Sequence, residues 1–315
     1  MQTLAVLMDD INHIKAYKDT TFALMLAAQR RQMQIMIFTQ KDWYVRDGKV
    51  RAYVQTVRLT DRDEDYYQVL NEEDIDLIHA DVILQRKDPP FNLNYIYDSY
   101  MLNLLAAQGV MVINPPNALR NINEKFVIAQ IPQCTPPTLI SKSREDILDF
   151  LREHKEIVLK PLDKMGGRGI FKLSLGDKNL HAILDVMNPD EQETLMVQKF
   201  LPNISEGDKR ILIVNGEAVD HGLVRLPKEG EFRANLAAGG HGIVQALNER
   251  EYWLVEQVKP LIKREGLHLV GLDVIGGYIT EINVTSPTGL REIENATGQP
   301  IADTFWETLA QKMNE

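Results

Sequence analysis

Three oxygen-bearing side chains near the C-terminal end of the chain have the types and spacing of a metal site. Glu281 and Asn283 are two residues apart in the strand-like stretch ITEINV, so alternation places both on one face. Asp273 lies in the preceding apolar stretch LVGLDVIG, where an unpaired carboxylate would be costly. If the two stretches pair as a hairpin, the three side chains form a set that suits Mg²⁺, which retains waters and binds phosphate oxygens. The alternative is a surface hairpin with its polar residues in solvent.

A glycine-rich turn and a lysine indicate where phosphate could bind. The turn MGGRG, residues 165–169, lies between two predicted strands, and its glycines allow backbone amides to approach phosphate oxygens. It is neither a P-loop nor a dinucleotide fingerprint, because no GK[ST] follows and the glycine spacing differs. A plain hairpin turn is the alternative. Lys160 ends the apolar stretch EIVLKP, where a lysine usually needs an anionic partner. The alternative for Lys160 is a side chain that extends into solvent.

Several arginines lie near predicted loops, namely Arg86, Arg210, Arg225, Arg233 and Arg291. Arg86 follows a predicted strand, and open α/β sheets bind their ligands at the carboxyl ends of strands. Guanidinium groups bind carboxylates with two parallel hydrogen bonds, whereas any single arginine is more often a solvated surface charge. Together with the phosphate and metal candidates, this set indicates that a carboxylate is activated by phosphoryl transfer.

Strands and helices alternate in the first 120 or so residues, which predicts parallel βαβ units in an open α/β sheet. The predicted strands are 3–8, 34–38, 80–85 and 110–113, and the predicted helices are 20–31 and 93–108. The segment 45–59 interrupts this alternation, and its turn signal RDGK predicts an inserted hairpin.

After about residue 121 the pattern indicates a mixed α+β unit, so we expect a domain boundary near residue 120. We expect helices at 123–130, 143–153 and 249–265, with strands at 156–161, 169–175, 195–200, 210–214, 217–226, 267–275 and 278–284. Asn215 and Gly216 predict a hairpin turn of the primed type. The polar, Gly/Ala-rich segment 226–242 predicts a mobile loop.

The composition narrows the functional class. A net charge of −10 over 315 residues argues against a general nucleic-acid or anionic-membrane binder. Cys134 is the only cysteine, which fits a reducing cytoplasm, and we expect neither a signal peptide nor a membrane span. The seven histidines form no HExxH motif. A dinucleotide oxidoreductase is disfavoured, because Met8-Asp9-Asp10 stands where GxGxxG would follow the first strand.

An ordered set of motifs along nearly the whole chain resembles the bacterial glutathione synthetases of the ATP-grasp superfamily. The matching stretches are RKDPPF, INPP…LRNINEK, LKPLDKMGGRGI, QKFLP…GDKRILIVNGE, RANLAAGGHG, VGLDVIG and TEINVTSPTG. The resemblance implies an N-terminal α/β substrate-binding domain (1–121), a central lid domain (122–201) and a C-terminal catalytic domain (202–315). It also implies that γ-glutamylcysteine, glycine and ATP give glutathione, ADP and phosphate through an acyl phosphate. A cytoplasmic homotetramer is implied as well.

The resemblance also carries roles onto residues of this chain. Nucleotide contacts fall on Lys125, Lys160, Gly166, Gly167, Gln198, Lys199, Phe200, Leu201 and Asp208, with Asp273 and Asn283. The Mg²⁺ ligands, with Mn²⁺ as a possible substitute, are Asp273, Glu281 and Asn283. The catalytic charges are Arg210, Arg225 and Lys160. The peptide and glycine contacts are Arg86, Arg210, Arg225, Arg233, Asn235, Ser286, Pro287 and Thr288.

The chain departs from the family pattern at Arg168-Gly169 in the phosphate turn and at Gly289-Leu290 after TSPT. Whether Arg168 or His241 contacts phosphate stays open. Two further alternatives are another carboxylate–amine ligase with a different peptide substrate and a non-catalytic nucleotide-binding module. The length of the resemblance disfavours the first. The intact oxygen ligands disfavour the second, because such a module has no need of a metal set.

Overall fold

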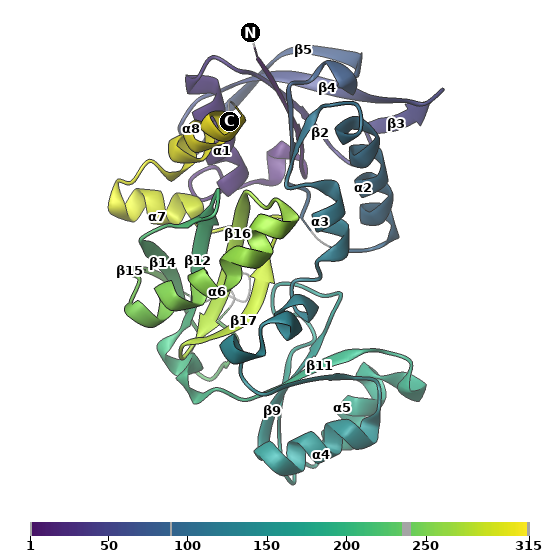
Figure 1. The fold of residues 1–315 in the computed structure, drawn as a ribbon, viewed down its shortest axis with the longest axis vertical. Coiled ribbons are helices and arrows are strands. Elements are labelled where there is room, and N and C mark those ends of the chain that lie inside the picture. The colour runs from purple at the N-terminus through teal and green to yellow at the C-terminus, as the bar shows by residue number, and fades with distance from the viewer. Residues whose placement is uncertain (1, 89, 235–240, 314–315) are drawn as a thin grey trace.

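The computed structural model describes residues 2–88, 90–234 and 241–313, and within them the strands form three sheets (Figure 1). A seven-stranded sheet occupies the N-terminal third of the chain, a four-stranded sheet the middle, and a six-stranded sheet the C-terminal third. Figure 1 places the six-stranded sheet between the other two, with the four-stranded unit at the opposite end of the molecule from the N-terminus.

The parallel α/β unit predicted for the N-terminal part is confirmed. Four strands are parallel in the order β2-β1-β6-β7. They are β1 (Thr3–Leu7), β2 (Gln34–Phe38), β6 (Val82–Gln85) and β7 (Met111–Ile113). The connecting helices are α1 (Thr20–Arg30) and α2 (Leu93–Ala106). The Asp19 side chain caps α1 by accepting a hydrogen bond from the Phe22 backbone amide, which fixes where this helix begins.

The insertion after β2 is larger than the predicted hairpin. The predicted turn joins β3 (Trp43–Arg46) to β4 (Lys49–Leu59), and a further strand, β5 (Tyr67–Asp76), pairs antiparallel with β4 along its whole length. The sequence of β5, YQVLNEEDID, has no apolar alternation, because both of its faces are largely exposed. Its stability therefore comes mainly from backbone pairing, which leaves no hydrophobic period to detect.

The middle sheet is antiparallel in the order β10-β9-β11-β8. Its strands are β8 (Thr138–Ser141), β9 (Glu156–Pro161), β10 (Phe171–Ser174) and β11 (Leu195–Lys199), packed with α4 (Arg144–His154) and α5 (Leu180–Met187). The helix predicted at 123–130 is wrong, because only a 3₁₀ turn, Phe126–Gln130, forms there. Strand β8, helix α5 and the six-residue helix α3 (Pro116–Asn121) were not predicted, because elements this short do not show a detectable hydrophobic period.

The third sheet has the order β15-β14-β12-β16-β17, with the two-residue β13 (Glu217–Ala218) beside β12. Its other strands are β12 (Asp208–Val214), β14 (His221–Leu226), β15 (His241–Ala246), β16 (Leu269–Ile275) and β17 (Tyr278–Asn283). Asn215 and Gly216 both have positive φ, as a primed turn requires. The predicted strand 217–226 is interrupted between β13 and β14, and β15 was not predicted.

The two faces of the third sheet are chemically different. Ile211, Val270 and Leu272 belong to one apolar cluster with residues of α6 (Glu249–Glu265), such as Leu254. The intervening residues of β12 and β16 point to the opposite face because side chains alternate along a strand. This second face carries Arg210 and Asp273, which are cross-strand partners. Alternation thus puts this charged pair on the face away from α6, where Leu212 and Leu269 join a second apolar cluster.

A bulge in β17 decides which of its residues join that charged face. Glu281 pairs with Asp273, but Ile279 pairs with Val274, so the register shifts between the adjacent residues 273 and 274. Thr280 is the extra residue of β17. Ile279 is fully buried in the apolar cluster, whereas Glu281 lies on the charged face. One extra residue in a strand moves the side chains that follow it to the opposite face of the sheet.

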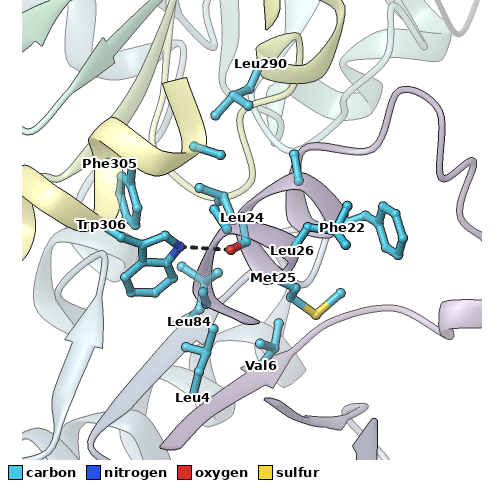
Figure 2. Close-up of a cluster of buried hydrophobic side chains, with 14 of the residues drawn as sticks. Leu4, Val6, Phe22, Leu24, Met25, Leu26, Leu84, Leu290, Phe305 and Trp306 are labelled. Carbon is cyan, nitrogen blue, oxygen red and sulfur yellow. Dashed lines mark hydrogen bonds between the residues drawn. The ribbon is translucent and has the colours of Figure 1, made fainter. Parts of the chain in front are cut away.

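The C-terminal helices return to the N-terminal sheet. Helices α7 (Leu290–Thr297) and α8 (Ile301–Met313) contact α1, and Phe305 lies in one apolar cluster with Leu4 and Leu24. Figure 2 shows this cluster, in which the Trp306 indole Nε1 donates to the Leu24 carbonyl at 2.8 Å. The first and last parts of the chain therefore share one core.

We predict that Glu251→Ala destabilises the fold. Glu251 closes the capping box at the start of α6 and also pairs with the buried Lys209 at 2.8 Å. Removing it leaves an uncompensated buried ammonium group, so we expect a loss of about 3–5 kcal/mol in the free energy of unfolding, measured by urea denaturation. Glu256→Ala, at an exposed position of the same helix, is the control and should change stability little. Equal effects of the two substitutions would contradict this account.

Candidate active site

Two adjoining pockets lie where the middle and third sheets face each other. The apolar pocket is lined mainly by Pro136, Val158, Ile170, Phe200, Leu201, Ile204 and Ile275, with Lys160, Gln198, Lys199 and Asp208 among its polar residues. The polar pocket is lined by Asp88, Glu124, Gly166, Arg210, Arg225, Asn283, Thr285, Ser286 and Thr288, with Met165 and Leu223. Asp273 and Glu281 line both pockets. The two spaces therefore meet at these carboxylates.

Residues 198–201, for which nucleotide contacts are predicted, form one wall of the apolar pocket at the end of β11. The Gln198 side chain is buried and donates to Thr138 Oγ1 at 3.2 Å, which holds it against the sheet. The Lys172 ammonium lies 3.8 Å from the centre of the Phe200 ring, an arrangement typical of a cation–π contact. A flat aromatic group fits such an apolar slot.

Asp273 is the centre of a buried network of charges. Arg210 donates to its two carboxylate oxygens from Nε at 2.5 Å and from Nη2 at 2.9 Å. Nη2 of Arg225 lies 2.9 Å from Asp273 Oδ2 and 2.5 Å from Asp208 Oδ2. The four side chains are all less than 10% exposed: Asp273 2%, Arg210 6%, Arg225 6% and Asp208 9%. A buried charge needs such partners to remain ionised.

The two carboxylates of this network titrate differently. Burial alone would raise the pKa of Asp273, but the guanidinium groups of Arg210 and Arg225 outweigh it and hold that pKa below its usual range. Burial raises the pKa of Asp208 to about 6, because its single guanidinium partner, Arg225, offsets the desolvation only in part and two other carboxylates lie near. Asp273 therefore stays ionised to lower pH than Asp208 does.

Glu281 lies between two buried lysines. Its Oε1 atom is 4.0 Å from Lys125 Nζ and 3.9 Å from Lys160 Nζ. Burial lowers the pKa of Lys160, and Glu281 restores it only in part. Burial also acts to lower the pKa of Lys125, but Glu281 and Glu124 together raise it above the usual value. The Lys125 ammonium pairs with Glu124 and donates to the Lys164 carbonyl at 2.8 Å, next to the glycine turn.

The donor set fits a metal that takes part of its coordination from a ligand. Among the described residues, no group of three His, Cys, Asp or Glu side chains could hold a metal ion by itself. Asn283 Nδ2 donates to the Gly271 carbonyl, so its side-chain oxygen is the atom that can act as a ligand. Mg²⁺ needs only one or two carboxylates when phosphate and water complete its shell. Asp273, Glu281 and Asn283 meet that requirement, although arginines now bind both Asp273 oxygens.

The glycine turn contacts the segment that follows β14. Gly166 lines the polar pocket, and Gly166 and Gly167 both have positive φ, which glycine adopts without strain. Arg233 lines the apolar pocket, pairs with Glu231 at 2.6 Å and donates to the Gly167 carbonyl at 3.2 Å. Of the predicted loop 226–242, the structure describes residues 226–234 and also 241–242, which begin β15. Asn235 lies outside the described residues, and so does the side chain of His241.

Arg86 does not line either pocket. It is buried, and it donates to Thr21 Oγ1 at 3.0 Å and to the Pro287 carbonyl at 2.9 Å. Ser286 Oγ in turn donates to the Arg86 carbonyl at 3.3 Å. Arg86 therefore holds the turn 286–288 in place without lining the polar pocket, whereas Ser286 and Thr288 do line it.

Sequence reasoning missed one partly buried carboxylate and left one arginine unassigned. Glu124 lines the polar pocket, and burial followed by the nearby charge of Glu281 raises its pKa. Its only signal in the sequence was its place beside Lys125. Arg291 lies away from both pockets, where it pairs with Asp61 and stacks over Phe22. Arg291 is buried and lines neither pocket, so it is not the solvated surface charge that was the alternative for these arginines.

Comparison with known sequences identifies close relatives. The family model described as the prokaryotic glutathione synthetase N-terminal domain matches residues 2–120, and that of the prokaryotic glutathione synthetase ATP-grasp domain matches residues 124–298. The chain is 43% identical over 310 residues to the glutathione synthetase of Pseudomonas aeruginosa, covering 98% of each chain. It is 42% identical over 310 residues to that of Coxiella burnetii, covering 98% of this chain and 96% of the relative.

Solved structures with similar folds are ATP-grasp ligases and related synthetases. D-cycloserine synthetase DcsG superposes with a TM-score of 0.71 at 13% identity, covering 98% of this chain and 99% of that chain. ATP-grasp ligase PsnB superposes with a TM-score of 0.64 at 18% identity, covering 99% of both chains. At such low identity the likeness establishes the fold alone, and the predicted ATP-grasp fold is confirmed.

We predict that Asp208→Asn removes a pH dependence of stability. Folding raises the pKa of Asp208 from 3.8 to about 6, so the folded state binds the extra proton in that interval. The stabilisation from this group is fully present below the lower value and is lost as pH rises through the upper one. Relative to the variant, the wild type should lose about 3 kcal/mol of unfolding free energy across this window. Urea denaturation of both proteins at a series of pH values measures this, and a constant difference would refute it.

Proposed function

The chain belongs to the prokaryotic glutathione synthetase family, and we propose that it joins γ-glutamylcysteine to glycine with hydrolysis of ATP to ADP and phosphate. The enzyme is then an ATP-dependent ligase that forms a peptide bond, as its ATP-grasp fold leads us to expect. The single observation that carries the proposal is the meeting of the apolar and polar pockets at Asp273 and Glu281. A nucleotide base in the first pocket and a carboxylate substrate in the second would bring their reacting groups to this boundary.

The charges at the boundary suit the transferring phosphoryl group. Lys125, Lys160, Arg210 and Arg225 are buried there, and their positive charges would neutralise the equatorial oxygens of the γ-phosphate. In the apolar pocket, backbone groups of residues 198–201 would contact adenine and Asp208 the ribose. Backbone amides of Gly166 and Gly167 would face the phosphates.

A divalent metal is expected with ATP in this family, and we propose Mg²⁺, with Mn²⁺ as a substitute, held by Asp273, Glu281 and Asn283. When bound, the metal neutralises charge on the phosphate oxygens. Arg210 and Arg225, which pair with Asp273, keep their guanidinium groups beside this set of ligands. Their positive charges would face the anionic substrate groups.

The reaction follows in two balanced steps. A carboxylate oxygen of γ-glutamylcysteine attacks the γ-phosphorus, the bond to the bridging oxygen breaks, and ADP leaves with that electron pair. Arg210 and Arg225 would hold the resulting acyl phosphate. The glycine amine then attacks the carbonyl carbon, the C–O bond to phosphate breaks with its electron pair going to phosphate, and the departing phosphate takes up the amine proton. Closure of the segment 226–242 would exclude the water that hydrolyses acyl phosphates.

The proposed substrate contacts are supported by different observations. Ser286 and Thr288 are supported by their place in the polar pocket, and Arg233 by its contact with the glycine turn. Arg86 and Pro287 would act indirectly, by fixing the turn through the hydrogen bond between them. Asn235 is proposed from the family resemblance alone.

We also propose the domain limits 1–121, 122–201 and 202–315, each of which contains one of the three sheets. A homotetramer and a cytoplasmic location are proposed from the family resemblance. None of the described helices is long and apolar enough to cross a membrane.

A coupled assay of ADP release tests the proposal. We expect turnover only when ATP, Mg²⁺, γ-glutamylcysteine and glycine are all present, with glutathione formed in equal amount to ADP. If no ADP is released with all four components present, the proposal is wrong. Turnover with a different dipeptide or amine in preference to these would instead favour another ligase of the same fold.

We predict that Glu281→Gln keeps the fold but lowers kcat by about 100-fold or more, because it removes the anion between Lys125 and Lys160 and one proposed metal ligand. Glu217→Gln, at an exposed position of β13, is the matched control and should retain full activity. Circular dichroism and the melting temperature report folding. Unimpaired kcat in Glu281→Gln would show that the proposed metal ligands are wrong.

A further inference from the structure

We propose that Gly271, in the middle of β16, is a positioning residue for phosphoryl transfer, because the Arg210 side chain passes through the space that a side chain at 271 would fill. The inference rests on the proposed function, in which Arg210 touches the reacting carboxylate and phosphate. It adds a requirement that lies outside both pockets, since Gly271 is not among the residues that line them.

The place of Gly271 in the sheet explains the encounter. Gly271 is two residues from Asp273 on β16, so the two positions point to the same charged face. Its cross-strand partners are Leu212 on β12 and Asn283 on β17. Arg210 starts two residues from Leu212 on β12, and its stem runs over Gly271.

The distances leave no room for a β-carbon. A Cβ built on Gly271 would lie 2.9 Å from Arg210 Cδ and 3.2 Å from Arg210 Nε. It would also lie 3.1 Å from Cβ of Pro287. Carbon atoms in contact prefer separations of about 3.5–4.0 Å, so a methyl group here would press on both neighbours.

Backbone conformation does not require glycine at this position. Gly276 and Gly277, which form the following turn, have φ of 55° and 78°, whereas Gly271 is not among the residues with positive φ. Glycine also weakens the interior of a strand, because it adds conformational entropy to the unfolded chain. What the structure needs at 271 is therefore space, and Arg210 is what fills it.

Neither neighbour can yield without cost to the site. The Pro287 carbonyl is held from behind by Arg86 at 2.9 Å. The Arg210 guanidinium is fixed at the far end by its two hydrogen bonds to Asp273. Since the Arg210 stem is the flexible member, it would move, and the guanidinium would leave Asp273 and its place in the polar pocket.

The experiment is Gly271→Ala. We expect kcat to fall by about 100-fold, as displacement of a catalytic group by about 1 Å can cause. The dissociation constant for ADP, whose base would sit in the apolar pocket, should stay unchanged. The control is Leu212→Val, which removes a methylene group from the strand position opposite Gly271 and should reduce stability while preserving kcat.

A crystal structure of Gly271→Ala provides a readout independent of turnover, and we expect the Arg210 guanidinium to have left Asp273. If the wild type lacks ligase activity, the proposed function fails, and this crystal structure still decides the steric claim. Arg210 still paired with Asp273, or equal losses of kcat in Gly271→Ala and Leu212→Val, would overturn the inference.

Should Gly271→Ala fail to fold, the double variant Gly271→Ala/Arg210→Ala decides the matter. Because this variant lacks the Arg210 stem, it should fold if the clash is with that side chain. A double variant that is unfolded where Arg210→Ala alone folds would overturn the inference, since the space at 271 would then serve neighbours other than Arg210.

Discussion

The buried carboxylate of Asp273 is the constraint on which the rest of the site depends. An ionised group that is 2% exposed must be paired, and Arg210 and Arg225 supply that pairing from two neighbouring strands. The same pairing fixes both guanidinium groups at the boundary between the pockets. A single buried anion thus orients both arginines of the site.

Sheet geometry lets one element serve both the core and the chemistry. On β12 and β16 one face packs against α6, and the other carries Arg210 and Asp273 at the pockets together with residues such as Leu212 that join the core shared with the N-terminal sheet. Strand β17 achieves this only through its bulge at Thr280, whose hydroxyl donates to the Asp273 carbonyl at 3.2 Å. Without the extra residue, Ile279 and Glu281 would share a face, and one of them would be misplaced.

The N-terminal domain supports the site from outside. Arg86, at the carboxyl end of β6, holds the turn 286–288 through the Pro287 carbonyl. The Asn114 amide donates to the carbonyls of Leu269 and Val284, where β16 begins and just after β17 ends. The return of α8 to α1 adds apolar burial between the same two parts of the chain. These contacts make the placement of the turn a property of the whole molecule, and at Gly271 both that turn and the Arg210 stem lie against β16.

The sequence by itself determined the parallel N-terminal unit, helices α1, α2, α4 and α6, and the hairpin that brings Asp273 opposite Glu281, because long periodic segments and glycine turns are local signals. It did not reveal β5, β8, β15 or α5, which are short or lack an apolar period. Only the tertiary structure decided that Arg86 binds the turn 286–288 without lining a pocket, and that Glu124 pairs with Lys125. It also decided that the Arg210 side chain fills the space beside Gly271. Such facts depend on which distant side chains share a space, and local spacing carries no information about that.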